Sequence, residues 1–315
     1  MKTLASLIET HYGIRVHNLS RVCEGAGGDV YYADTGAGRF VLKGTVKSDI
    51  YACNEPRLAK YLAAQGIPVP AFLPTKDGAD FFRRGKWQYN LRPYVEWTVY
   101  GYNEAPAWLI TESAQMLGRI HHVLAAFEPL PMGIGPDFFA FLRSDAPRIS
   151  YIKTLSLAKA AGEDDVAADV EFRLSRLHKL QEQSYDYARF TRGNTHGDYK
   201  ISQIVCREGH IAAIIDWTSA CRHPLCWEVI RSYAHAAPEG ARGAIDSEGL
   251  RDYLAEYTRY APLTDYDLRM MPYFYRDQLL ACDYYGQYYA SKGQNRMDYL
   301  AQARFATGVL RVMDF

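Results

Sequence analysis

Two segments in the second half of the chain decide the fold: THGDYKISQ at residues 195–203 and IIDW at residues 214–217. Between them lie two short apolar runs, residues 203–206 and 211–215, which are typical of a buried strand pair. Long stretches with helical periodicity flank this region on both sides. Residues 194–217 therefore form a non-helical island in a helical region, and we expect an island of this kind to carry a functional site.

The N-terminal part of the chain has the composition and glycine punctuation of strands. Val, Tyr and Phe are concentrated in residues 21–24, 29–34 and 39–43, which predicts a three-stranded meander. Residues 50–65 have helical spacing that ends at a glycine followed closely by a proline, so we expect one helix there. Residues 81–95 then return to strand, as a hairpin.

From residue 106 onward the periodicity is that of helices. We predict helices over residues 108–126, 138–159, 164–189, 227–236, 246–260 and 265–292. A strand-rich lobe followed by a mainly helical lobe places the chain in the α+β class with a bilobal architecture. We assign residues 1–95 to the N-terminal lobe and residues 96–315 to the C-terminal lobe, which holds the two loops.

The composition is that of an ordinary globular chain, and a length of 315 residues favours two lobes over one. Its 36 basic and 36 acidic residues cancel, so no global positive field favours a nucleic acid or a membrane surface as a partner. No long apolar run predicts a signal peptide or a membrane span. Six cysteines without a CxxC pair predict neither disulfides nor zinc, which indicates a cytoplasmic protein.

The two loops and their surroundings resemble a family of small-molecule kinases. HGDY with IIDW is similar to the pattern of the aminoglycoside phosphotransferase and choline kinase superfamily, H-G-D-x-x-x-x-N followed by I-D-[FW]. Lys43 in the run VLK looks like the strand lysine, Glu55 looks like its helix partner, and residues 117–121 resemble the helix entering the large lobe. The segment CRHPLCW at 221–227 is similar to spore-coat-kinase-like members. The resemblance implies a protein-kinase-like fold.

The resemblance also implies catalytic and metal-binding roles. Asp198 orients the acceptor hydroxyl, and Lys200 supplies positive charge near the transferred phosphate. Asp216 binds Mg²⁺ through its carboxylate, because a hard cation takes oxygen ligands. Gln203 stands where the family has an asparagine as second metal ligand, and its amide oxygen is carried on a side chain one methylene longer.

The nucleotide is expected in the cleft between the lobes, so that ATP and Mg²⁺ are the implied cofactors. Lys43 neutralises the phosphates while Glu55 restrains the lysine side chain. The adenine lies on the backbone of residues 92–96. The residues implied in nucleotide binding besides Lys43 and Glu55 are Gly25, Gly27, Gly28, Tyr94 and Val95.

Three questions stay open at this point. Because glutamine replaces the usual asparagine at Gln203, the alternative to an active kinase is a catalytically weak or inactive nucleotide-binding scaffold. The hydroxyl acceptor is an amino alcohol, a sugar or an aminoglycoside. Late tyrosines form either an aromatic cage for an organic cation or ordinary core packing. They are Tyr266, Tyr273, Tyr275, Tyr284, Tyr285, Tyr288 and Tyr289.

Overall fold

The structure is a computed structural model that describes residues 3–25, 28–46 and 49–313. Internal contacts divide the chain into two compact units. The first consists of Met1–Val99 with Gln203–Ala220, and the second of Tyr100–Ser202 with Cys221–Phe315. The lobe boundary between residues 95 and 96 stays a prediction, and the predicted metal loop is described below with the first unit.

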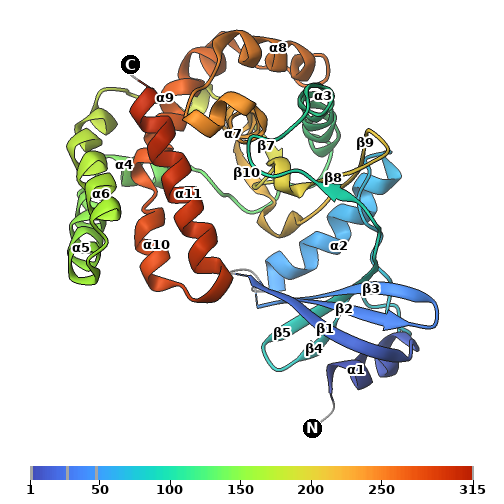
Figure 1. Cartoon of the computed structure of the whole chain (residues 1–315). Coiled ribbons are helices and arrows are strands. Elements are labelled where there is room, and N and C mark those ends of the chain that lie inside the picture. Colours follow the sequence, from blue (N-terminus) through green and yellow to red (C-terminus); the bar gives the residue numbers. More distant parts are fainter. Residues whose placement is uncertain (1–2, 26–27, 47–48, 314–315) are drawn as a thin grey trace. The chain divides into compact units, whose positions relative to one another are not determined.

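An antiparallel sheet in the order β1-β2-β3-β5-β4 organises the first unit (Figure 1). Its strands are β1 Val16–Gly25, β2 Gly28–Thr35, β3 Gly38–Thr45, β4 Phe82–Arg84 and β5 Trp87–Pro93. The predicted meander and hairpin are confirmed, with strands that run longer than the apolar clusters that revealed them. Val, Tyr and Phe are frequent in these strands because a pleated, half-buried surface suits branched and aromatic side chains.

Helix α1, Leu4–Tyr12, packs against this sheet and was not predicted from the sequence. Thr3 caps its first turn by accepting a hydrogen bond from the backbone of Ser6 at 3.2 Å, and Gly13 ends it in the left-handed region. Ile8 is fully buried in a cluster with Leu42 and Leu91 of the sheet. Tertiary burial of this one face therefore stabilises a helix that is too short to be stable alone.

A second group of strands in the first unit follows the order β6-β8-β9. The strands are β6 Thr98–Val99, β8 Ile204–Arg207 and β9 His210–Ile214, so the predicted buried strand pair is confirmed. The hairpin is attached to the N-terminal residues through a 2.8 Å hydrogen bond from the Ile214 amide to the Pro68 carbonyl. Helix α2, Asp49–Ala64, contacts the short turn Trp217–Ser219 that follows β9.

The second unit is mainly helical, as predicted. Its helices are α3 Ala107–Leu124, α4 Pro136–Leu142, α5 Ala146–Ala161, α6 Asp164–Arg176, α7 Leu225–Ala236, α8 Ser247–Thr258, α9 Asp265–Ala281, α10 Tyr284–Ala290 and α11 Gly293–Val312. Strands β7 Arg192–Thr195 and β10 Cys221–Pro224 pair antiparallel and flank the loop that carries Asp198.

Three helix predictions in this unit were wrong in extent. The helix predicted over 138–159 is split into α4 and α5, since Pro147 begins a new helix near its N-terminus. The helix predicted over 164–189 ends at Arg176. The helix predicted over 265–292 is broken at Cys282, which is extended, and Asp283 caps α10 by accepting the Gly286 amide at 2.7 Å.

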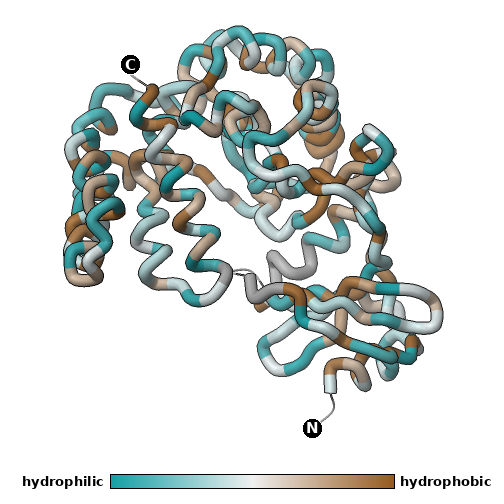
Figure 2. Tube along the Cα trace, in the orientation of Figure 1, coloured by the Kyte–Doolittle hydropathy of each residue, from teal (hydrophilic) through white to brown (hydrophobic). Residues whose placement is uncertain are grey.

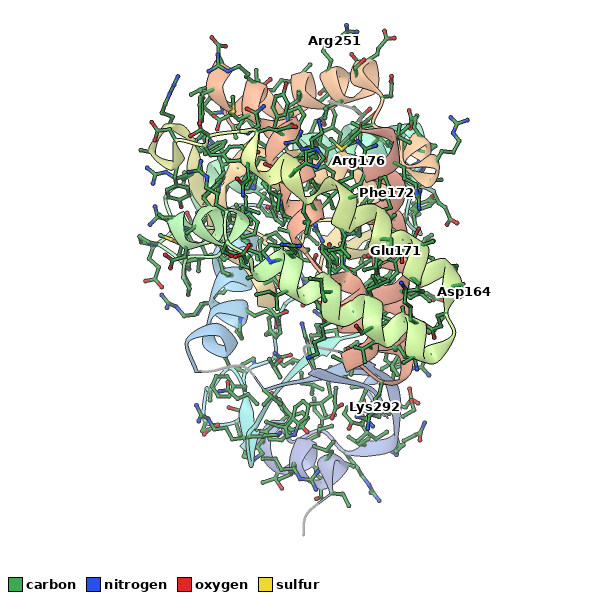
Figure 3. All side chains as sticks on the ribbon, turned by 90° about the vertical axis from the view of Figure 1, so that its left-hand side faces the viewer. Asp164, Glu171, Phe172, Arg176, Arg251 and Lys292 are labelled. Atoms are coloured by element: carbon green, nitrogen blue, oxygen red, sulfur yellow. The ribbon has the colours of Figure 1, made fainter. Side chains whose placement is uncertain are left out.

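The helices of the second unit each combine hydrophilic and hydrophobic stretches, as helices with one buried face do (Figure 2). Phe139, Phe190 and Phe274 meet in a cluster that joins α4, the segment before β7, and α9. Figure 3 shows Phe172 on α6, whose ring lies under the guanidinium groups of Arg176 at 5.5 Å and Arg311 at 4.4 Å. No helix of the described residues has the length and apolarity that a membrane crossing requires.

Candidate active site

A buried lysine with two carboxylates forms the first part of the candidate site, and all three residues belong to the first unit. The Lys43 ammonium lies 3.1 Å from Oε1 of Glu55 and 2.8 Å from Oδ1 of Asp216. Lys43 comes from β3 and Glu55 from α2, and both are buried, whereas the Asp216 side chain is 40% exposed. The structure therefore brings together three residues that the sequence places far apart.

Electrostatics keep this lysine charged. Burial alone would lower the pKa of the Lys43 ammonium, but the carboxylates of Glu55 and Asp216 outweigh that effect and raise it above its ordinary value. The result is a fixed positive charge in a dry environment. An ammonium held in this way is suited to neutralise an anionic ligand such as a phosphate.

Asp216 sits at the end of β9 in an unusual backbone conformation. Its φ angle is 63°, in the left-handed region that non-glycine residues adopt rarely. Its Oδ1 also accepts a 2.6 Å hydrogen bond from the Thr218 hydroxyl, which helps to fix the carboxylate. Strain of this kind is common where a side chain is aimed for function.

Gln203 lies at the same end of the hairpin as Asp216. Gln203 precedes β8, Asp216 follows β9, and the amide of Ile215 donates to the Gln203 carbonyl at 3.0 Å. One carboxylate and one amide oxygen are a suitable donor set for Mg²⁺, which usually keeps several waters and takes its other ligands from phosphates. Among the described residues no three His, Cys, Asp or Glu side chains cluster as a metal site.

The predicted phosphate-covering turn is described only in part. Gly25 and Gly28 pair with each other at the ends of β1 and β2. Gly27, which was predicted to contribute, lies outside the described residues. Tyr94 follows β5, and its amide donates to the Arg39 carbonyl at 2.9 Å, so an adenine on this segment would use other backbone groups of Tyr94 or Val95. The role of these residues stays a prediction.

The loop after β7 forms the second part of the candidate site, in the second unit. Asp198 uses both carboxylate oxygens: Oδ1 accepts from Nη2 of Arg231 at 2.6 Å, and Oδ2 lies 3.2 Å from the Lys200 ammonium. Burial alone would raise the pKa of the Asp198 carboxyl, but Arg231 and then Lys200 outweigh it and hold this pKa below its ordinary value. The Asp198 side chain is 24% exposed, so its ionised carboxylate is accessible to a ligand.

Glu228 on α7 anchors the backbone of this loop. The Glu228 carboxylate accepts the amides of His196 at 3.1 Å and Tyr199 at 3.3 Å. It also lies 3.0 Å from Nε2 of His121 on α3, and neither side chain is exposed. Burial would raise the pKa of Glu228, but the hydrogen bond and charge of His121 lower it to about 2. Glu228 thus remains ionised and holds two loop amides at once.

Two site residues were missed by the sequence analysis. His121 has the helical spacing of an ordinary packing residue, and only the fold shows that it bonds both Glu228 and the Tyr257 hydroxyl, the latter at 2.8 Å. Arg231 carries no motif of its own. Its position one helical turn after Glu228 is the one signal that relates it to the loop.

The late tyrosines are occupied by contacts within the chain. Arg296 lies over the ring of Tyr288 at 4.3 Å and donates to its hydroxyl at 2.7 Å, while Tyr289 donates to Glu163 at 2.6 Å. Tyr151 and Tyr285 flank the buried guanidinium of Arg173. Four of the seven late rings, those of Tyr266, Tyr273, Tyr285 and Tyr288, have an arginine of the chain over them, which favours the core-packing interpretation over a cage for an external cation.

The chain belongs to the phosphotransferase enzyme family, whose profile matches residues 18–263. The predicted family resemblance and the kinase-like α+β fold are thereby confirmed, and the chain is an enzyme of the small-molecule kinase type. A search of curated protein sequences finds no match.

Three solved structures illustrate the fold. An amicoumacin kinase in complex with AMP-PNP and Ca²⁺ is 15% identical, with a TM-score of 0.66 over 98% of this chain and 92% of that chain. A spectinomycin phosphotransferase in complex with ADP and spectinomycin is 15% identical, with a TM-score of 0.65 over 99% and 94%. A macrolide 2'-phosphotransferase from Brachybacterium faecium is 17% identical, with a TM-score of 0.54 over 99% of both chains.

Proposed function

We propose that the chain transfers the γ-phosphate of ATP to a hydroxyl group of a small molecule in a Mg²⁺-dependent reaction. The observation that carries this proposal is the cluster of Lys43, Glu55 and Asp216, in which two carboxylates fix a buried ammonium. Phosphoryl transfer requires positioned charge more than covalent chemistry. The complexes of the amicoumacin kinase with AMP-PNP and of the spectinomycin phosphotransferase with ADP support a nucleotide as the donor.

Each residue then has a defined task. Lys43 binds donor phosphates, and Asp216 with Gln203 would hold Mg²⁺, which supplies charge neutralisation on the phosphates when bound. Asp198 accepts a hydrogen bond from the acceptor hydroxyl and orients it for attack. Lys200 contributes positive charge where negative charge develops on the transferred group. We expect the enzyme to act in the cytoplasm, where ATP is available.

We infer that the acceptor is a small molecule that carries a hydroxyl group. The spectinomycin phosphotransferase in complex with spectinomycin and the macrolide 2'-phosphotransferase support a hydroxyl-bearing small molecule such as an amino alcohol, a sugar or an aminoglycoside. The acidic residues late in the chain give little support to a polycation, because several have partners within the chain. Asp267 caps α9 and binds Thr191, Asp277 pairs with Arg276, and Asp283 caps α10.

The test is ADP release from Mg²⁺-ATP across a panel of amino alcohols, sugars and aminoglycosides. We expect one class of acceptor to stimulate release, and Asp198→Ala to reduce the stimulated rate by about 10²- to 10⁴-fold. The control is Asp265→Ala, at the surface end of α9. Silence across the panel with ATP bound normally would contradict the proposal.

The second candidate function is a nucleotide-binding scaffold, favoured by glutamine at position 203. Gln203→Asn separates the two. A scaffold binds ATP with little dependence on Mg²⁺ and shows no transfer before or after the change. For an enzyme, the wild type already shows Mg²⁺-dependent transfer, and the asparagine variant alters its Mg²⁺ requirement.

A further inference from the structure

One face of helix α7 contacts both the backbone of the loop that carries Asp198 and the carboxylate of Asp198 itself. Glu228 accepts the amides of His196 and Tyr199, and Arg231, one turn later, donates to the carboxylate of Asp198. Residues three apart project from the same side of a helix, so the two contacts form a single rigid template. Glu228 fixes where the loop runs, and Arg231 fixes where its carboxylate points.

We propose that Arg231 is a positioning residue for phosphoryl transfer: it locks one carboxylate oxygen of Asp198 so that the other faces the acceptor hydroxyl. This inference rests on the proposed function of Asp198. The Nη2 to Oδ1 distance of 2.6 Å is that of a strong charge-assisted hydrogen bond. The Arg231 side chain is 10% exposed, so solvent screens this contact little.

Among the described residues, the Arg231 guanidinium donates through Nη2 to Asp198, and its Nη1 is buried without a hydrogen-bond partner. Its guanidinium lies over the Trp227 ring at 5.4 Å, and its backbone carbonyl accepts a hydrogen bond from Nδ1 of His235 at 2.7 Å. Behind it, Arg231 and Tyr275 line a cavity of about 10 Å³. A space of that size admits about one water and excludes a substrate group. On this side the guanidinium therefore has no room for a substrate group, and its side-chain hydrogen bond goes to Asp198.

The charges that face Asp198 explain why an arginine is needed. Lys200 and His196 come from the loop, and Arg231 and His235 come from α7. Burial, followed by the charge of Arg231, lowers the pKa of His235 to about 3, so this imidazole stays neutral near pH 7. Arginine stays charged at every accessible pH and offers a planar fork that holds one geometry, which lysine does not.

Kinetics of four variants test the inference with the acceptor found by the panel. Arg231→Met is expected to lower kcat about 10²-fold, as a misplaced group does, while KM for ATP changes less than twofold. It should also move the acidic limb of the kcat profile to higher pH, because Asp198 loses its main countercharge. Arg231→Lys should keep the acidic limb at its wild-type pH and recover part of the kcat that Arg231→Met loses. Arg231→Ala should regain activity on addition of guanidinium ion.

The control is Arg276→Met, which removes an equally buried arginine that pairs with Asp277. We expect it to leave the position of the acidic limb unchanged and to show no guanidinium rescue. An unshifted limb in Arg231→Met, or equal behaviour of the Arg231 and Arg276 variants, would overturn the inference, since a purely structural arginine affects stability alone.

A second readout needs no acceptor. Carbon-13 labelling of aspartate carboxyl groups reports the titration of Asp198, which is assigned by its loss in Asp198→Asn. We expect the Asp198 midpoint to rise in Arg231→Met and to stay in place in Arg231→Lys and Arg276→Met. A midpoint unchanged in Arg231→Met overturns the inference. If the midpoint rises and yet no acceptor is phosphorylated, the proposed function fails and the coupling between Arg231 and Asp198 stands.

Discussion

Replacing Glu228 with glutamine removes one charge from a fully buried network and leaves its shape almost unchanged. The carboxylate accepts two loop amides and contacts His121, whereas glutamine presents an NH₂ group in place of one of these acceptors. At least one buried donor then loses its partner, at a cost of about 1–3 kcal/mol. We expect Glu228→Gln to lower the free energy of unfolding by that amount or slightly more.

The pKa of Glu228 gives an independent magnitude. A fall from the ordinary 4.5 to about 2 on folding corresponds to roughly 3 kcal/mol of stability, at 1.36 kcal/mol per pKa unit. Because the folded pKa is depressed, this contribution is fully present above the unfolded value near 4.5 and is lost as pH falls toward 2. The wild type should therefore lose stability over this range, and Glu228→Gln should lose less.

Urea unfolding followed by tryptophan fluorescence, at pH 7 and at intervals down to pH 3, measures both effects. Amide hydrogen exchange of residues 196–199 locates the change, since Glu228 holds two of these amides. Glu248→Gln is the matched control, because its side chain is 77% exposed and pairs only weakly with Arg251. A Glu228→Gln variant within 0.5 kcal/mol of wild type, with loop exchange unchanged, would refute the reasoning.

Two further changes test the packing around the site. Gly118→Ala puts a Cβ atom 2.5 Å from the carbonyl oxygen of Tyr257, so α3 and α8 must separate. We expect the free energy of unfolding in urea to fall by about 1–3 kcal/mol. The control is Gly36→Ala, which should be nearly neutral because the nearest atom to its new Cβ is 3.7 Å away. Lys43→Met leaves Glu55 buried without its cation, so we expect the free energy of unfolding at pH 7 to fall by about 3 kcal/mol. The variant should also lose most of its affinity for ATP, which calorimetry measures. Normal binding of ATP by this variant would show that Lys43 does not contact the nucleotide.

The residues at the centre of each part of the site were predictable because short motifs carry them. Lys43 ends an apolar strand run, and Asp198 and Asp216 sit in loops whose neighbours have a recognisable pattern. The pattern is local, so one sequence suffices to find it. The structure brings Lys43, Glu55 and Asp216 into contact, and their roles in the reaction stay predictions.

The supporting residues were not predictable, for a physical reason. His121 and Arg231 lie on helices whose polar positions usually face solvent, and the sequence does not reveal that these two are buried. Their partners come from other elements, so the hydrogen bonds exist only once α3, α7 and the loop are packed. Helix α11 was missed as well, since its boundary at Gly293 follows a stretch already assigned to the preceding helix.

The two parts of the site have opposite local charge, which the composition of the chain conceals. One lysine with two carboxylates gives a net charge of −1 for Lys43, Glu55 and Asp216, and one carboxylate with two cations gives +1 for Asp198, Lys200 and Arg231. The negative cluster suits a divalent cation, and the positive one suits a group on which negative charge develops. The charges of the two clusters are equal in size and opposite in sign, so the zero net charge of the whole chain reveals neither cluster. The separation of charge is a property of the fold of each unit, since neither cluster is formed by residues adjacent in the sequence.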